Sequence, residues 1–383
     1  MKTIRNLTSL LLGLLLVSCS SRDATDDGNV LHLAPLRATQ EVEDLSPYIA
    51  DLELVRVGSD STAIPGIAKI LYSDPVVFLA GGAVYATTPD FQEIRKVGNS
   101  GRGPGEYISV KDIAVSADGN EVWCMDVLNA VLRYDLKTLS YLGKIDFRMD
   151  KKEYVRAMIP QEDGTVALYT PNPAGDFPQE GETFHCLTLY DLAGEPVGRQ
   201  LPWTRFNVMA AFAIPVSPQV TGEYILTPES SPVAYVFNTG GLDHRIEFDF
   251  GSKWIPRKFF DPKDGDPAPK VGDLFDRDCF KLIAPVFYAG QDLYFMAFGK
   301  DSSRWNFYLS RDGSRGIRWR SVGVATPPIC AIASDGAYLL FNYEDYGLVK
   351  EERDPLKKCV IQQFGLPQKT GDSYLIKVKL RLL

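Results

Sequence analysis

A tight turn and a short apolar strand stand together in Asp118-Gly119-Asn120-Glu121-Val122-Trp123-Cys124-Met125. Aspartate and glycine supply the positive φ angles that tight turns between antiparallel strands require. The same arrangement recurs at intervals of 45 to 68 residues in Asp163-Gly164, Thr221-Gly222, Ala289-Gly290 and Asp335-Gly336, with an earlier relative in Ser73-Asp74. These recurring turns predict six similar units, each built around a hairpin.

A second pair of short strands follows several of these turns. The pairs are Ala130–Asp135 with Ser140–Ile145, Cys186–Asp191 with Glu195–Gly198, and Asn306–Gly313 with Gly316–Trp319. Each unit is therefore predicted to hold four short antiparallel strands. Six such units in about 330 residues predict an all-β fold, the six-bladed β-propeller, in which each blade covers its faces by stacking on its neighbours. A β-sandwich would not give six similar units at this period.

The ends of the chain and the longer intervals refine this prediction. Asp51–Val57 is predicted to add an outer strand to the last blade, because an open ring would leave two sheet edges exposed. Tyr374–Leu383 is predicted to be a closing strand. Insertions are expected at Pro171–Thr183 within the third blade, at Gly251–Asp278 before the fifth, and at Glu344–Asp372 in the sixth, where a short helix is expected.

The N-terminus carries a targeting signal. Lys2 and Arg5 precede a mostly apolar run from Leu7 to Val17, which is too short to span a bilayer and is typical of a secretory signal. The run ends in Leu16-Val17-Ser18-Cys19, which resembles the bacterial lipobox, whose cysteine is acylated and becomes the new N-terminus. The alternative is a plain secretory signal followed by a chance cysteine.

The targeting signal leads us to divide the chain into three expected segments. We expect a signal peptide over residues 1–18, lipidated Cys19 with a tether and N-terminal segment over 19–44, and the propeller over 45–383. The expected location is the cell envelope, with a lipid anchor in the outer membrane, at its periplasmic face or at the cell surface. The formal charge of −8 disfavours nucleic acid and anionic membrane surfaces as general partners, because proteins bind both through basic patches. Membrane contact is therefore predicted through the lipid.

The five other cysteines show no regular spacing and no C-x-x-C pair. They are Cys124, Cys186, Cys279, Cys330 and Cys359. We expect buried, small apolar side chains rather than a disulfide framework. One disulfide in an oxidising periplasm is the alternative.

A glycine-rich segment gives the chain a family resemblance. Val97–Tyr107 reads Val-Gly-Asn-Ser-Gly-Arg-Gly-Pro-Gly-Glu-Tyr and contains a G-x-G-P-G-E-Y loop. This loop resembles that of the NHL-like six-bladed β-propeller lipoproteins of Bacteroidetes-type bacteria, and Leu45–Val55 is similar to the segment before their propeller. The resemblance covers most of the chain after Cys19. It implies the fold and an envelope location, and it implies no catalytic residue.

The same loop supplies two candidate binding residues. Gly101–Gly105 lacks the Lys-Ser/Thr of a phosphate-binding P-loop, and strands are predicted on both sides, so a tight crossover between blades is the preferred interpretation. The functional interpretation places Arg102 and Glu106 at the mouth of the central channel. Tyr107 is expected to pack between blades.

The remaining candidate binding residues come from two other regions. Trp203 and Arg205 lie in a loop predicted between the third and fourth blades, and tryptophan and arginine are favoured at recognition sites. The alternative role for Trp203 is to fill a gap between blades. Lys111, Asp112 and Arg156 stand at the start of predicted inner strands, where they either line the channel or pair with one another.

Motifs for catalysis and metal binding are missing from the sequence. His32, His185 and His244 are scattered, and no H-x-x-x-H, D-x-D-x-D-G or G-x-S-x-G pattern occurs. We therefore expect no metal and no cofactor. The sequence favours a binding or scaffold module for a protein, peptide or glycan partner. The alternative is a propeller enzyme, a lyase or hydrolase that acts on glycans at the central channel.

Overall fold

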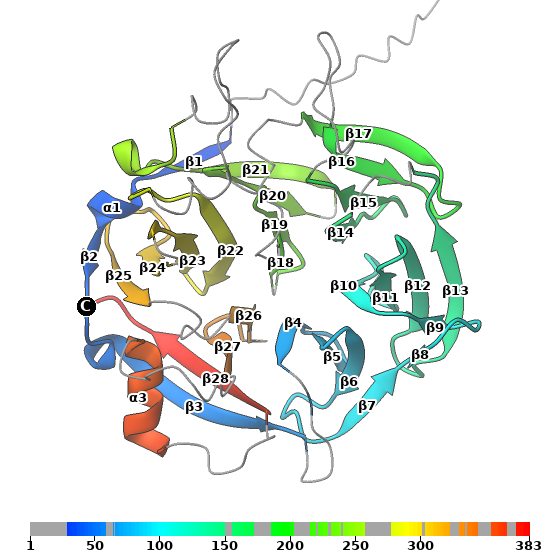
Figure 1. Cartoon of the computed structure of the whole chain (residues 1–383), viewed down its shortest axis with the longest axis horizontal. Coiled ribbons are helices and arrows are strands. Elements are labelled where there is room, and N and C mark those ends of the chain that lie inside the picture. Colours follow the sequence, from blue (N-terminus) through cyan, green and yellow to red (C-terminus); the bar gives the residue numbers. More distant parts are fainter. Residues whose placement is uncertain are drawn as a thin grey trace, which may run out of the picture.

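Six antiparallel sheets stand around a common axis, and Figure 1 looks along that axis. The computed structural model describes residues 29–58, 64, 66–149, 155–171, 185–202, 215–219, 221–228, 231–238, 240–256, 277–300, 303–321, 329–333, 335–343, 354–365 and 373–383. The chain is the mainly β, six-bladed propeller that its repeated turns predict.

The first three blades are four-stranded meanders formed by consecutive strands. Their strands are β4 (Ile67–Leu71), β5 (Val76–Ala80), β6 (Ala83–Thr87) and β7 (Ile94–Val97); β10 (Val110–Val115), β11 (Glu121–Asp126), β12 (Ala130–Asp135) and β13 (Tyr141–Asp146); and β14 (Ala157–Pro160), β15 (Val166–Tyr169), β16 (His185–Tyr190) and β17 (Pro196–Pro202). The first strand of each blade lies nearest the axis and the fourth lies at the rim (Figure 1).

Blades four and five each gain a fifth strand from the N-terminal segment. Blade four holds β18 (Val216–Pro218), β19 (Tyr224–Leu226), β20 (Val233–Asn238) and β21 (Gly241–Phe248), and blade five holds β22 (Leu282–Ala289), β23 (Asp292–Phe298), β24 (Arg304–Ser310) and β25 (Gly316–Ser321). Strand β1 (Val30–Leu33) pairs in parallel with β21, and β2 (Thr39–Glu41) pairs in parallel with β25. Helix α1 (Pro35–Ala38) joins these two added strands.

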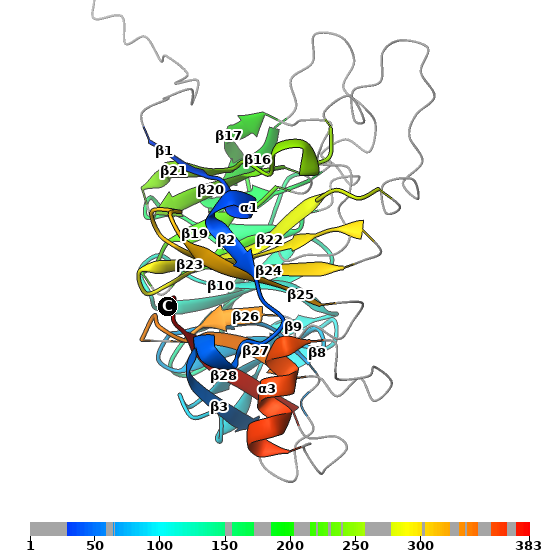
Figure 2. The same ribbon diagram turned by 90° about the vertical axis from the view of Figure 1, so that its left-hand side faces the viewer.

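The last blade closes the ring with strands from both ends of the chain. It contains β26 (Ile329–Ile332), β27 (Leu339–Tyr343), β28 (Ser373–Leu380) and β3 (Ile49–Val57). Strand β3 pairs antiparallel with β28 from Ser373↔Val57 to Leu380↔Ile49, which confirms the predicted closure. Helix α3 (Pro355–Phe364) confirms the helix expected in this blade, and it lies beside β3 and β28 in the edge-on view (Figure 2).

The predicted turns are the first hairpins of their blades. Gly119, Gly164, Gly222, Gly290 and Gly336 all have positive φ, between 64° and 84°. In four of these turns the glycine amide donates to the carbonyl three residues earlier, as Gly119 does to Ser116 (2.9 Å). A Cβ added at these five glycines would meet no atom within 4 Å. Backbone conformation, not space, therefore requires glycine at these positions.

Apolar side chains fill the spaces between neighbouring blades. Tyr107 is buried among residues of blades one and two, where its hydroxyl donates to the Val97 carbonyl (3.0 Å), so the predicted packing between blades is confirmed. Cys124, Cys186, Cys279 and Cys359 are buried, and none of them forms a disulfide within the described chain, as expected. The side chain of Cys330 lies outside the described residues.

The short elements complete the described chain. They are the 3-10 helices η1 (Ser46–Tyr48) and η3 (Gly251–Lys253), and the strands β8 (Asn99–Ser100) and β9 (Glu106–Tyr107), which form a two-stranded parallel sheet after β7.

Candidate functional site

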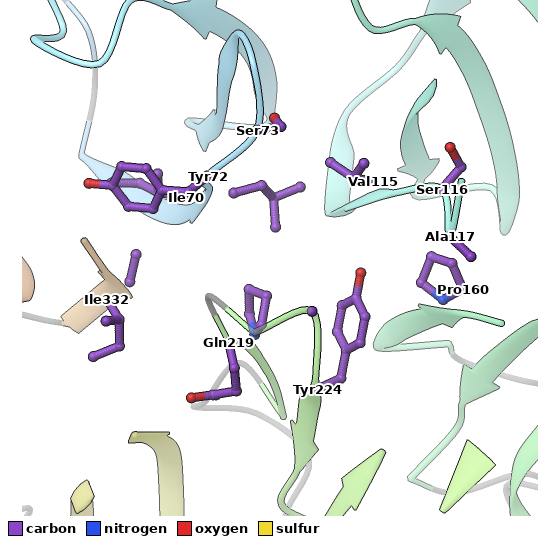
Figure 3. Close-up of a pocket in the computed structure, with 14 residues that line it drawn as sticks. Ile70, Tyr72, Ser73, Val115, Ser116, Ala117, Pro160, Gln219, Tyr224 and Ile332 are labelled. Atoms are coloured by element: carbon purple, nitrogen blue, oxygen red, sulfur yellow. The ribbon is translucent and has the colours of Figure 1, made fainter. Parts of the chain in front are cut away.

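A cavity of about 190 Å³ opens at the axis, where the innermost strands end (Figure 3). Five blades contribute to its wall. The lining residues are Ile70–Ser73 from blade one, Val115–Ala117 from blade two, Pro160 from blade three, Pro218, Gln219, Gly222 and Tyr224 from blade four, and Ala331 and Ile332 from blade six. The repeated meander brings these residues together because the first strand of each blade ends on the same side of the ring.

The hydroxyl of Tyr224 is a polar group that is available to a ligand inside this cavity. Its ring points from β19 toward the middle of the space (Figure 3). Within the described residues, its hydroxyl has no hydrogen-bond partner. The hydroxyls of Ser73 and Ser116 are instead held by their own turns, through the Pro75 carbonyl and Asp118 Oδ1, each 2.6 Å away. Burial, and then the nearby negative charge of Asp112, raise the pKa of Tyr224, so its hydroxyl stays protonated at neutral pH.

Gln219 makes the cavity wall rigid. Its side-chain nitrogen donates to the carbonyls of Ser217 (2.9 Å) and Val286 (3.2 Å), and its side-chain oxygen accepts from the backbone amide of Tyr288 (2.9 Å). Val286 and Tyr288 belong to β22, so one turn residue of blade four fixes the innermost strand of blade five. The wall is therefore formed before any ligand arrives.

The lining suits binding of a small uncharged group. Among the described residues that line the cavity there is no Asp, Glu, His, Lys or Arg. The volume is below the roughly 300–1,000 Å³ of typical small-molecule sites. A single amino-acid side chain or one sugar ring is on the scale of this space, and the Tyr224 hydroxyl offers it one donor and one acceptor.

Asp112 is buried deeper along the axis and serves the fold. Its Oδ1 lies 2.6 Å from Lys69 Nζ, and both side chains are at most 3% exposed. Its Oδ2 accepts from the Met158 amide (2.9 Å), so the carboxylate joins blades one, two and three. The sequence allowed for pairing of Asp112 with Lys111 or Arg156, but its ion-pair partner is Lys69, and the buried carboxylate does not face an accessible channel.

Lys111 and Arg156 lie near the start of the innermost strands, at the end of the axis opposite the cavity. The pairing of β10 with β11 skips Lys111, and such bulges re-aim a side chain. Lys111 Nζ donates to Asn129 Oδ1. Burial lowers the pKa of Lys111 to about 8, with a smaller contribution from the positive charge of Arg156, while Asp126 and Asp112 oppose this shift. The structure thus brings Lys111 and Arg156 close together.

The glycine-rich loop is a structural crossover at the rim. Strands β8 and β9, which flank it, lie at the outer edge of the ring (Figure 1). Glu106 Oε2 accepts from the Gly103 amide (2.7 Å), and the Tyr134 hydroxyl donates to the Gly105 carbonyl (3.0 Å). The expectation that Arg102 and Glu106 stand at the channel mouth is therefore wrong. The chain makes this turn directly after β7, before it returns to the axis.

Residues 58–310 match the family model described as DUF5128, 6-bladed beta-propeller. The chain belongs to this six-bladed β-propeller family. The structure is similar to that of a protein from Bacteroides fragilis NCTC 9343 that is named as an exported protein, with 13% identity over 92% of this chain and 100% of that chain, and a TM-score of 0.69. A protein of unknown function from Bacteroides caccae matches with 10% identity over 66% of this chain and 85% of that chain, and a TM-score of 0.35. No curated protein matches the sequence.

Several predicted features of this propeller lie outside the described residues. They are Cys19, Trp203 and Arg205. In the described ranges, no group of three or more His, Cys, Asp or Glu side chains could hold a metal ion. No helix in the described part of the propeller is long and apolar enough to cross a membrane.

Proposed function

We propose that this propeller is a lipid-anchored binding module of the cell envelope, and that a protein, peptide or glycan partner inserts one uncharged group into the axial cavity. The observation that carries the proposal is the convergence of five blades on a preformed cavity with the Tyr224 hydroxyl inside it. A site built by loops on a rigid scaffold is the usual arrangement for recognition. The lipoprotein resemblance of the G-x-G-P-G-E-Y loop supports the same function.

The expected position of the lipid anchor leaves the axial cavity accessible to a partner. Cys19 would carry the lipid, and residues 20–29 span at most about 35 Å when fully extended. The first strand after them, β1, lies at the rim of blade four rather than at the axis (Figure 1). A tether that joins at the rim leaves the axial cavity open to a partner. The likeness of the fold to a protein named as exported supports an envelope location.

Binding is favoured over catalysis by the chemistry of the described residues. A glycan hydrolase needs positioned carboxylic groups, and a lyase needs a base near the proton that it removes. The described lining of the axial cavity contains neither a carboxylate nor a histidine, and the nearby Asp112 is held by Lys69 and Met158.

The test is an affinity pull-down of the intact lipidated chain from gently solubilised membranes, read by quantitative mass spectrometry. Ala117 lines the cavity and is exposed, so Ala117→Trp should block the cavity without disturbing the core. Ala193 is an exposed turn residue of blade three outside the lining, and Ala193→Trp is the matched control. We expect a near-stoichiometric partner with the wild type and with Ala193→Trp, and its loss with Ala117→Trp.

Two outcomes would count against the proposal. Retention of the partner by Ala117→Trp would remove the axial cavity as the site. If no other protein co-purifies with the wild-type chain, a protein or peptide partner is contradicted. A thermal-shift screen against glycans would then test the glycan partner alone.

A further inference from the structure

A second cavity, of about 420 Å³, lies on blade five at the side that faces blade four and helix α1. Residues from several separate segments line it, including Leu36 of α1. Lys253 comes from η3, Asp278 precedes β22, Lys300 follows β23, and Trp305, Arg318 and Arg320 come from β24 and β25. We call this cavity the blade-five cleft. Its volume lies within the range of small-molecule sites, whereas that of the axial cavity does not.

The blade-five cleft concentrates positive charge in an acidic protein. Lys253, Lys300, Arg318 and Arg320 line it, and Asp278 is the only carboxylate among the described lining residues. Lys281 adds a further positive charge under the wall, where its Nζ donates to the Gly299 carbonyl (3.0 Å). The whole chain has a formal charge of −8, so this local excess opposes the overall balance. A cleft lined by charges of one sign attracts ligands of the opposite charge.

Two of the four lining cations are held by the protein itself. Lys253 Nζ lies 2.6 Å from Asp278 Oδ2, and Arg318 donates to the Thr39 carbonyl (2.6 Å) and approaches Glu41 (3.5 Å). In the described ranges, neither Lys300 nor Arg320 has an ion pair or a hydrogen bond through its side chain. These two side chains are therefore available to an anionic ligand.

Trp305 places an aromatic face among these charges. The guanidinium carbons of Arg318 and Arg320 each lie 5.9 Å from its ring centroid, within the range of cation–π contacts. Phe280 packs edge-on against the ring, with centroids 6.2 Å apart and planes at 79°. The ring is partly exposed and its position is fixed by this packing. A fixed aromatic face beside Lys300 and Arg320, neither of which pairs with a carboxylate in the described ranges, suits a flat, partly apolar ligand that carries negative charge.

We propose that the blade-five cleft binds an acidic saccharide. A sugar ring stacks on Trp305, and its carboxylate is bound by Arg320 and Lys300, since a guanidinium matches the geometry of a carboxylate. A bare inorganic anion would leave the tryptophan and most of the volume unused. A nucleic acid would need a longer basic surface than one cleft on a chain of charge −8. This site is separate from the axial cavity, with which it shares no lining residue.

The test is calorimetric titration of the full-length chain in detergent with trigalacturonate and with its methyl ester, which keeps the sugar rings and removes the charges. We expect tighter binding of the acid, weakened by salt. Lys300→Glu and Arg320→Glu change exposed side chains, and each should weaken binding by about ten-fold or more, because each removes a charge-assisted hydrogen bond and puts a negative charge in its place. Trp305→Phe keeps an aromatic ring and should weaken binding less than either.

Two controls separate the site from general charge and from the axial cavity. Lys137→Glu makes the same change at an exposed turn of blade two and should leave the affinity unaltered, as should Ala117→Trp. Equal affinity for the methyl ester, or unaltered affinity in both Lys300→Glu and Arg320→Glu, would overturn the proposal. So would citrate binding as tight as that of trigalacturonate. Binding to phosphatidylglycerol vesicles without binding to trigalacturonate would reassign the cleft to lipid phosphates and would overturn the proposal of a saccharide ligand.

Discussion

Lys69 and Asp112 form a buried ion pair across blades one and two, with Nζ and Oδ1 2.6 Å apart. The second carboxylate oxygen accepts from the Met158 amide of blade three. Half of the ring is thus joined near the axis through one aspartate. Each charge is buried, so each depends on the other for compensation.

The first prediction concerns the stability that this ion pair controls. Lys69→Met and Asp112→Asn should each destabilise the propeller by about 3–5 kcal/mol, because each leaves an uncompensated buried partner. The double variant should be less destabilised than the sum of the two. Urea unfolding followed by tryptophan fluorescence measures all three free energies of unfolding. Additive losses would show that the two side chains act independently.

The second prediction concerns the pH dependence that Lys111 confers. Burial lowers its folded-state pKa to about 8 from the ordinary 10.5, so between these values the unfolded chain binds more protons than the folded one. Stability contributed by this group therefore rises as the pH increases through that window. The free energy of unfolding of the wild type relative to Lys111→Met should increase from pH 7.5 to pH 10. A difference that does not change with pH would contradict the shift.

The third prediction compares two glycines of equal φ. Gly105 and Gly119 both have φ of 74°, but a Cβ on Gly105 would lie 2.9 Å from the Tyr141 ring, whereas one on Gly119 would meet nothing within 4 Å. Gly119→Ala should cost about 1–2 kcal/mol for the left-handed backbone alone. Gly105→Ala should cost a further 1–3 kcal/mol or so for overpacking. Urea midpoints of the two variants check this order, and equal midpoints would show that the loop yields freely.

The fourth prediction tests the closing strand. Leu52 of β3 is buried in the core of the last blade, opposite Val378 of β28. Leu52→Ala should destabilise the ring by about 2–5 kcal/mol, as large-to-small core changes do. Leu128→Ala makes the same change at a side chain that is 69% exposed and should shift stability by no more than about 0.5 kcal/mol. Similar unfolding midpoints for the two variants would mean that β3 contributes little to closure.

The fold was predictable because its signal is local and repeated. In blades two to six, the first two strands are joined by a turn such as that at Gly119, and backbone conformation requires glycine there. The added strands β1 and β2 were not predicted, because short parallel pairing at a rim leaves no turn signal in the sequence. The position of the loop around Arg102 was misjudged, because a turn between blades can lie at the rim or at the axis, and the residues alone do not distinguish the two.

The candidate sites were less predictable than the fold. Asp112 stood out as a polar residue on an inner strand, but Lys69, its partner 43 positions earlier, is recognised only in three dimensions. Tyr224 was not among the predicted site residues, although its place two residues after the turn at Gly222 could have identified it, since the ends of the inner strands converge at the axis. Arg320 and Lys300 come from separate strand ends and share no motif.

The proposed function depends most on the axial cavity being a binding site. A photoreactive benzophenone side chain introduced at Ala117 would report this in living cells, because benzophenone crosslinks to C–H bonds of a protein, a peptide or a glycan alike. We expect a discrete crosslinked species from position 117, absent when the same group replaces Ala193. No crosslink from position 117, or the same species from both positions, would contradict the account.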